Sequence, residues 1–273
     1  MNRQDVLLET SLLGLARFDH PQDEPHRDPR EEVSPEYSIN FVERGVFDLR
    51  VGRRSWRLYP GMVFLARQGL AFRCHHDEEI PRDTCLSLIP ATSLVEQGNS
   101  NWKTIWKTCA VHSSNRLAYL HLRLSRAVRS DAPSLAVETL ATEILTELEV
   151  LLGGASRKPY RAEQLDSYTE RVEAVRSLLE TRFTDPHSLN SLAGSVGISP
   201  FHFARVFREL TGKPPHRYLI EVRLTCALQF LRRGASVTEA CFAAGFSNLS
   251  HFIRLFRRRF GTLPSSFTRP RAS

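Results

Sequence analysis

Arginine side chains gather on one face of two helix-forming segments near the C-terminal end of the chain. From 185 to 273 there are 13 lysine and arginine residues against four acidic residues, a net charge of +9, whereas the whole chain carries +7. A guanidinium forms two hydrogen bonds with a guanine edge and also pairs with phosphate. Charge alone indicates either a polyanion-binding region or a solvated basic surface, and it does not distinguish DNA from RNA or an acidic membrane.

The same region contains an internal repeat. The first copy reads SLNSLAGSVGISPFHFARVFRELTGKPPHRY, and the second reads SVTEACFAAGFSNLSHFIRLFRRRFGTLPSSF. Equivalent residues such as Phe207 and Phe256 lie 49 positions apart, while Gly197 and Gly245 lie 48 apart. Each copy predicts a helix, a tight turn at the glycine and a second helix, with serine or asparagine caps before the helices.

The second helix of each copy is amphipathic. Its apolar residues recur at helical spacing and predict the inward face: Phe203, Val206, Phe207 and Leu210 in the first copy, and Phe252, Leu255, Phe256 and Phe260 in the second. The outward face carries Phe201, Ala204, Arg205 and Arg208 in the first copy, and Ser250, Ile253, Arg254, Arg257 and Arg258 in the second. Two such helices joined by a helix over 215–233 predict binding of double-stranded DNA at major-groove segments about 34 Å apart. A plain helical bundle is the alternative.

With these motifs the chain resembles the AraC/XylS family of bacterial transcription regulators, most densely from Val172 to Arg269. The pattern A-x-x-x-G-F-S/x-x-S-x-F-x-R-x-F-R/K-x-x-F-G-x-x-P-x-x-F/Y of the second copy is specific to that family. The resemblance implies an all-helical DNA-binding domain with recognition helices over about 200–210 and 248–260. It implies base-reading positions at Phe201, Ala204, Arg205, Leu249, Ser250, Ile253 and Arg254. The further DNA-binding candidates on these helices are Arg208, Asn248, Arg257 and Arg258. Ala204, Leu249 and Ile253 are apolar where family members often carry polar groups, so they are expected to contact thymine methyl groups or nothing.

The N-terminal half has the pattern of a small antiparallel sheet structure. Residues to about 35 are polar and predict a mobile arm or long loop, whereas Phe47, Leu49 and Val51 alternate with polar residues. Turn signals then separate short strand candidates over 55–59, 62–66, 71–74 and 84–89. The stretch RGVFDLRVGRRSWRLYPGMVFLARQG resembles, diffusely, the cupin-like effector domains of the same family, which bind a small effector or dimerise the protein.

The middle of the chain is helical. Residues 116–130 predict one helix, and Leu140, Ile144, Leu148 and Leu151 form the apolar stripe of another, which packs on its own barrel or on a second subunit. We therefore expect an α+β multidomain chain. It comprises a cupin-like antiparallel β-barrel in 1–115, a helical connector, with a dimerisation role left open, in 116–171, and an all-α domain with two helix-turn-helix units in 172–271.

Cys74, His76 and Cys85 form the one cluster with metal-ligand chemistry, although their spacing fits no standard zinc motif. Across a hairpin the two cysteines would instead face each other as a thiol pair able to oxidise. Two semi-buried thiols beside surface histidines are the third reading. We expect no metal and no cofactor, and the three alternatives stay open.

Together these observations favour a cytoplasmic, non-enzymatic regulator, because the sequence carries no signal peptide and no apolar run approaching the ~18 residues of a membrane span. The family resemblance implies an activator that contacts RNA polymerase, with a small-molecule effector and a homodimer as further expected partners. One alternative is a cupin-type enzyme with an appended DNA-binding module, which requires His and carboxylate metal ligands on the barrel strands. Another is an architectural or RNA-binding protein with little sequence preference.

Overall fold

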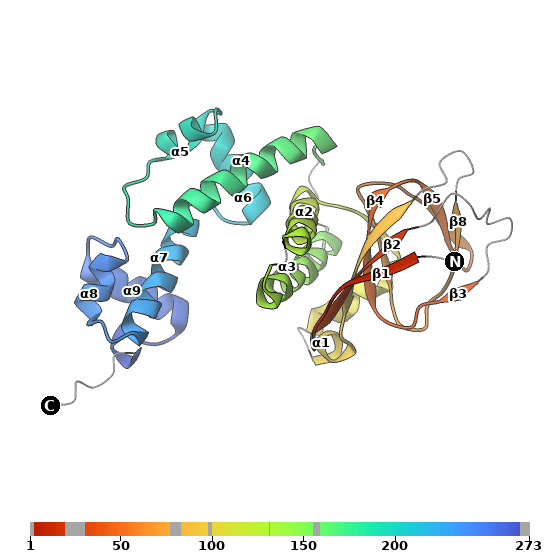
Figure 1. Cartoon of the computed structure of the whole chain (residues 1–273), viewed down its shortest axis with the longest axis horizontal. Helices are drawn as coiled ribbons and strands as arrows, with labels where there is room; N and C mark the ends of the chain where they lie inside the picture. The colour runs from red at the N-terminus through yellow and green to blue at the C-terminus, as the bar shows by residue number, and fades with distance from the viewer. Residues whose placement is uncertain are drawn as a thin grey trace. The chain divides into compact units, whose positions relative to one another are not determined.

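The computed structural model describes residues 3–19, 31–76, 83–97, 100–130, 132–154 and 159–267. The chain divides into two compact units, Met1–Tyr160 and Arg161–Ser273, which Figure 1 colours from red to green and from green to blue. The first unit combines sheets with helices, and the second is helical in its described part. The expected order of a sheet-rich N-terminal region followed by a helical C-terminal region is therefore confirmed.

Antiparallel strands build the first unit. In chain order they are β1 (Arg3–Glu9), β2 (Leu13–Asp19), β3 (Glu32–Val33), β4 (Ser38–Arg44), β5 (Phe47–Val51), β6 (Arg54–Leu58), β7 (Met62–Ala66), β8 (Ala71–His76), β9 (Thr84–Pro90) and β10 (Ala110–His112). Within the described residues they form a six-stranded sheet of order β1-β2-β9-β4-β7-β10 and a four-stranded sheet of order β3-β8-β5-β6. The expected closed barrel is thus not confirmed, because the two sheets stay open.

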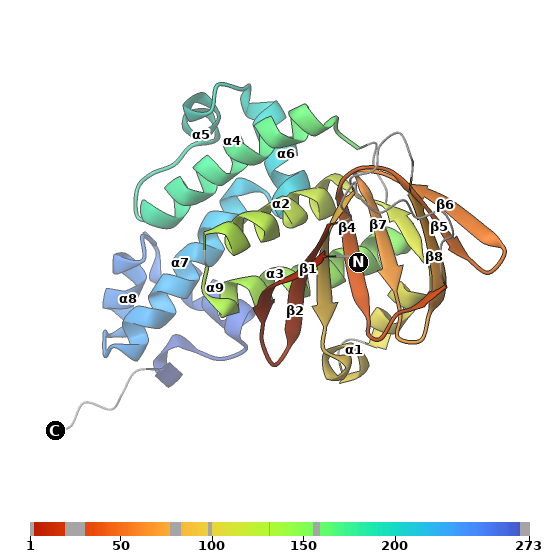
Figure 2. The ribbon, with the colours of Figure 1, turned by 45° about the vertical axis from the view of Figure 1, so that its right-hand side comes forward.

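Side-chain alternation gives the six-stranded sheet two different faces. On β4, Ile39 and Phe41 are buried on the face toward the helices, where the Phe41 ring stacks on His121 at 4.5 Å between centroids. Ser38 and Asn40 alternate with them and line a cavity on the other face. Figure 2 shows the resulting layers, with α2 and α3 on one side of the strands β4 and β7 and the strands β5, β6 and β8 on the other.

The β1–β2 hairpin contradicts the expected mobile arm over residues 3–19. The six-stranded sheet extends to this hairpin, since β2 pairs with β9 along its whole length, from Leu13 opposite Pro90 to Asp19 opposite Thr84. The Thr10 hydroxyl accepts hydrogen bonds from the N–H groups of Leu12 and Leu13, both at 3.2 Å, and so fixes the turn. Residues 20–30, which the same expectation covered, lie outside the described part of the chain.

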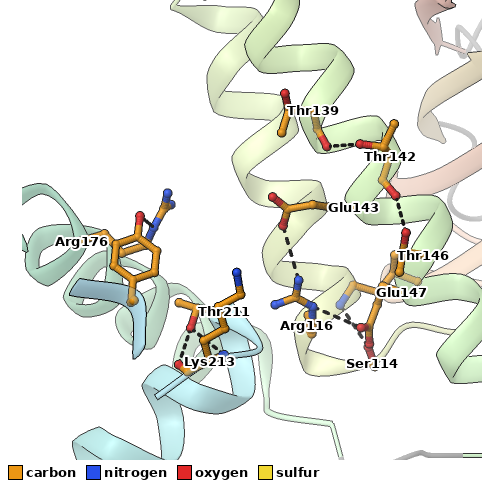
Figure 3. A network of polar contacts seen from close by, with 12 residues as sticks. Ser114, Arg116, Thr139, Thr142, Glu143, Thr146, Glu147, Arg176, Thr211 and Lys213 are labelled. Carbon is orange, nitrogen blue, oxygen red and sulfur yellow. Dashed lines mark hydrogen bonds and ion pairs between the residues drawn. The ribbon is translucent and has the colours of Figure 1, made fainter. Parts of the chain in front are cut away.

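Four helical segments complete the first unit: α1 (Thr92–Gln97), the 3₁₀ helix η1 (Ser100–Lys107), α2 (Asn115–Arg129) and α3 (Ser134–Leu152). The predicted stripe is buried at Leu140, Ile144 and Leu148, while Leu151 is half-buried. Figure 3 shows how polar contacts join α2 to α3. Arg116 bridges Glu143 at 3.4 Å and Glu147 at 3.2 Å, and the Ser114 hydroxyl donates to Glu147 at 2.7 Å. The apolar stripe therefore packs inside its own unit.

Glu43 on β4 ties the sheet to α2. Its carboxylate accepts a hydrogen bond from the Ser125 hydroxyl at 2.8 Å, lies 3.2 Å from the ring nitrogen of His121 and pairs with Arg17 at 3.4 Å. Burial alone would raise the pKa of Glu43, but these hydrogen bonds and the charges of His121 and Arg17 lower it to about 2. The carboxylate is therefore held as an anion between the sheet and the helix.

The second unit consists of helices. They are α4 (Ala162–Thr181), α5 (Leu189–Ser195), α6 (Pro200–Thr211), α7 (Pro215–Arg232), α8 (Val237–Ala243), α9 (Leu249–Phe260) and the 3₁₀ helix η2 (Pro264–Phe267). The repeat thus folds as α5–α6 and α8–α9, with α7 between them, as predicted. No helix in the described ranges is both long and apolar enough to cross a membrane.

Candidate DNA-binding surface

The first repeat positions α6 through caps and a left-handed turn. The Ser188 hydroxyl accepts from the N–H of Ser191 at 3.0 Å and begins α5, and Ser199 caps α6 with Pro200 in its first turn. Between the two helices Gly197 adopts φ 67°, a conformation that glycine reaches without the strain of a side chain. The predicted turn is therefore confirmed.

The second repeat positions α9 in the same way. Ser236 and Glu239 form a reciprocal capping box at the start of α8, and Gly245 makes the turn with φ 82°. Of the two caps that the sequence left open for the next helix, Asn248 is the one used, since its side-chain oxygen accepts from the N–H of His251 at 2.8 Å. Both α6 and α9 end at glycines in the left-handed region, Gly212 and Gly261.

Aromatic residues hold the two helices on their cores. Phe203 and Phe207 of α6 are fully buried, with ring centroids 5.5 Å apart. Phe252 and Phe256 of α9 occupy the same repeat positions, also at 5.5 Å and fully buried. Because one face of each helix is fixed in this way, the opposite face points to solvent.

The candidate DNA-binding residues differ in how much of each side chain is exposed to solvent. Phe201 is 85% exposed, an unusual state for a large apolar side chain. The other exposed candidates are Arg205, Arg208, Asn248, Ser250, Arg254, Arg257 and Arg258. Ala204 is half-buried, and Leu249 and Ile253 are half-buried against the core beneath α9. Leu249 and Ile253 therefore present only part of their side chains to a ligand.

The outward arginines carry uncompensated charge. None of Arg205, Arg208, Arg254, Arg257 and Arg258 forms an ion pair with another described residue, whereas Arg176 and Lys213 of the same unit do. Arg176 on α4 pairs with Glu173 at 2.7 Å and with Glu180 at 3.3 Å, and Lys213 pairs with Glu221. Figure 3 labels Arg176 and Lys213. The outward faces of α6 and α9 therefore carry arginines without ion-pair partners among the described residues, and a polyanion can pair with them.

Arg223 is a structural residue that the sequence alone did not single out. From α7 its Nε donates to the carbonyl of Phe183 at 2.7 Å, and its guanidinium also donates to the carbonyl of Asp185 at 3.1 Å. Burial lowers the pKa of Arg223. A Cβ added at Gly245 would meet this guanidinium at 3.1 Å and the Cα of Thr184 at 3.0 Å. Arg223 therefore joins the turn of the second repeat to the loop before the first, a link that no local sequence signal marks.

The two cysteines of the candidate cluster lie on strands of different sheets in the first unit. Cys74 lies on β8 and Cys85 on β9, and these strands belong to different sheets rather than to one hairpin. Burial raises the pKa of both thiols, and the charge of Asp83 raises it further, so neither forms the reactive thiolate readily. The side chain of His76 lies outside the described part of the chain. Among the described residues, no three His, Cys, Asp or Glu side chains are grouped to hold a metal ion.

The comparisons with known proteins agree on the repeat region. A family model described as a helix-turn-helix domain matches residues 192–270. The transcriptional activator RhaS of Escherichia coli O1:K1 is 35% identical over 137 residues, which cover 50% of this chain and 46% of that protein. The chain thus spans about half the length of the curated relatives it matches.

Two solved structures are similar to part of this chain. A probable AraC family transcriptional regulator from Rhodopseudomonas palustris CGA009 is 34% identical, covering 37% of this chain and 99% of that one, with a TM-score of 0.35. The DNA-binding domain of AdpA, solved in complex with a target DNA, is 28% identical over 36% of this chain and 88% of that one, with a TM-score of 0.34. With the repeat, its caps and its turns in place, residues 192–270 belong to the helix-turn-helix family that this model describes, and the chain is similar in sequence to regulators of the AraC family.

Proposed function

We propose that this protein is a transcription regulator that binds double-stranded DNA in a sequence-specific manner with α6 and α9. One observation carries the proposal: two helix-turn-helix units in one compact unit each present exposed arginines without ion-pair partners on the face opposite a fixed core. The DNA-binding domain of AdpA, which is 28% identical to the matched part of this chain, was solved with a target DNA, and this supports the assignment.

Individual side chains receive different roles in this proposal. Arg205 and Arg254, which share one repeat position, read guanine edges in two successive major-groove segments. Phe201 contacts thymine methyl groups, as do the exposed parts of Ala204, Leu249 and Ile253. The remaining candidates, Arg208, Asn248, Ser250, Arg257 and Arg258, position the helices through phosphates or add base contacts.

We propose that the rest of the chain regulates DNA binding by the second unit. We propose that residues 1–115 form a cupin-like sensing domain for a small effector, that 116–171 connect it to 172–271, and that the first unit forms a homodimer. The activator name of RhaS supports activation of transcription through contact with RNA polymerase. A cytoplasmic location follows from this role, since chromosomal promoters lie there.

The cupin-type enzyme alternative makes a different prediction. It requires a metal bound in the first unit, so metal analysis of the purified full chain tests it directly. Stoichiometric metal would favour the enzyme reading over the regulator reading of 1–115.

Selection of binding sites from a random duplex pool with the full chain tests the DNA-binding proposal. We expect enrichment of a site with two blocks about one helical turn apart. Arg205→Ala should relax the sequence of one block and Arg254→Ala that of the other, each at a cost of about 1–3 kcal/mol. The control is Arg182→Ala, which removes the same charge from an exposed position at the end of α4.

The control variant should retain both blocks, with at most a uniform loss of affinity. If no sequence is enriched by the full chain and binding falls steeply with salt for every duplex, the basic surface is a general polyanion site. In that case the architectural reading replaces the proposed one.

A further inference from the structure

A cavity of about 420 Å³ lies between the two sheets of the first unit. The six-stranded sheet contributes inward residues of β2, β4, β7 and β9, and the four-stranded sheet contributes residues of β3, β5 and β8. The alternation described above places these side chains on the face away from α2. The cavity is therefore built into the fold by strand pairing, and its volume suits a small organic molecule.

Phenylalanine rings dominate the cavity wall. Phe18 and Phe64 come from one sheet, and Phe47 and Phe72 from the other. Phe64 and Phe72 meet edge to face with centroids 5.1 Å apart. Aromatic faces carry negative electrostatic potential, so they attract an organic cation as well as an apolar body.

The charged lining residues are all acidic. Glu32 and Glu36 are exposed at the rim, and Asp83 is buried within the wall, with 2% exposure. Among the described lining residues there is no lysine, arginine or histidine. After burial itself, the charges of Glu32 and Asp83 further raise the pKa of the Cys74 thiol, so their negative potential reaches the wall.

The uncharged polar groups of the wall add few hydrogen-bond donors. The side-chain amide of Asn40 donates to the Ser38 hydroxyl at 2.9 Å and to the carbonyl of Phe64 at 3.2 Å, which uses both of its N–H groups. The Ser87 hydroxyl donates to the Asn40 carbonyl oxygen at 2.6 Å. An anionic ligand needs cations or more free donors than the described part of this wall offers, whereas an ammonium ion brings its own donors and charge.

From the aromatic rings and carboxylates, with no cationic side chain among the described lining residues, we propose that the cavity binds an organic ammonium compound with an apolar body. The proposal assigns a class of ligand to the sensing domain of the proposed regulator. Only the role of this ligand as an effector rests on the proposed function. Binding itself is measured without DNA, so failure of this inference and failure of the DNA-binding proposal are distinguishable.

Calorimetric titration of the full chain with three probes of similar size tests the proposal. The probes are benzylammonium, neutral benzyl alcohol and anionic benzoate. We expect benzylammonium to bind about tenfold more tightly than benzyl alcohol, and benzoate not to bind. Equal affinity for benzylammonium and benzyl alcohol, preference for benzoate, or no binding of any probe at millimolar concentrations would each overturn the proposal.

Two variants assign the binding to this cavity. Phe72→Leu keeps an apolar side chain but removes an aromatic face, and Glu36→Gln removes a rim charge at an exposed position where folding is little affected. Glu36→Gln should weaken benzylammonium several-fold and leave benzyl alcohol nearly unchanged, whereas Phe72→Leu should weaken both probes and benzylammonium more strongly. Glu163→Gln, an exposed acid on α4 in the other unit, is the matched control and should bind as the parent does. Unchanged benzylammonium affinity in both cavity variants would place the binding elsewhere and overturn the assignment.

Discussion

Two phenylalanines on α6, two positions apart, have opposite surroundings. Phe203 is fully buried in the core of the first repeat, whereas Phe201 is 85% exposed. We expect Phe203→Ala to lower the free energy of unfolding by about 3–5 kcal/mol because it leaves a cavity. Phe201→Ala should change that free energy by less than about 0.5 kcal/mol and yet weaken binding to the selected DNA site. Urea denaturation and DNA titration of both variants measure the two effects.

Comparing Phe201→Ala with Phe203→Ala distinguishes a DNA-binding role from a packing role on the same helix. A large loss of stability in Phe201→Ala would show that this ring packs against the protein in solution. Unchanged DNA affinity in the same variant would remove Phe201 from the recognition surface.

Glu43 makes the stability of the first unit depend on pH. Its folded-state pKa of about 2 lies below the ordinary value of 4.5, so the ionised carboxylate stabilises the fold above pH 4.5. That contribution is lost as the pH falls from 4.5 toward 2. Glu43→Gln should therefore be less stable than the parent at pH 7, and the difference should shrink toward pH 2.

Urea denaturation at a series of pH values measures this difference, with the exposed Glu96→Gln as the control. A gap between Glu43→Gln and the parent that stays constant with pH would mean that packing, rather than charge, explains the loss.

Sequence predicted the direction of most candidate side chains but not their exposure. The spacing of Phe203, Phe207, Phe252 and Phe256 placed them inward, and all four are fully buried. The same spacing placed Ile253 outward, yet it packs partly on the core under α9. Helical periodicity fixes an angle around the axis, whereas exposure also depends on neighbours that are distant in sequence.

At the scale of elements, the two turn glycines offer a matched pair. Gly197 and Gly245 both have positive φ, so alanine at either costs about 1–2 kcal/mol of backbone strain. Nothing lies within 4 Å of a Cβ at Gly197, whereas a Cβ at Gly245 would be 3.0 Å from the Thr184 backbone and 3.1 Å from Arg223. We expect Gly245→Ala to be less stable than Gly197→Ala by about a further 1–3 kcal/mol.

Thermal unfolding of the two variants gives the comparison. Equal losses would mean that the loop at 183–185 moves away without cost and that Arg223 does not hold the second repeat in place.

The elements that repeat were predictable, and those formed by long-range pairing were not. Serine caps, turn glycines and apolar spacing located α5, α6, α8 and α9 from local signals alone. The β1–β2 hairpin has no strict alternation, and it forms because β9 supplies hydrogen bonds from about 70 residues away. Whether the strands form two open sheets or a closed barrel likewise depends on which strands pair, and local sequence patterns do not predict this pairing.

For the whole molecule, the division into two compact units predicts independent folding. The fragment Arg161–Ser273 should be helical by circular dichroism, unfold cooperatively and select the same two-block DNA site as the full chain. If the fragment is unfolded, or is folded but selects a different site, then the first unit contributes to the recognition surface and the division does not describe the functional protein.

Strand β4 alone separates the cavity on one face of the sheet from α2 on the other. Asn40 faces the cavity, whereas Phe41 and Glu43 of the same strand face α2. An occupant that displaces the strand therefore also moves the carboxylate contacts to His121 and Ser125. Occupancy of the cavity and protonation of Glu43 then become linked equilibria, each changing the other's constant by the same factor. Because the pKa of Glu43 is about 2, proton uptake or release on binding reports the linkage only at acidic pH, where a calorimetric heat that varies with the ionisation enthalpy of the buffer would reveal it.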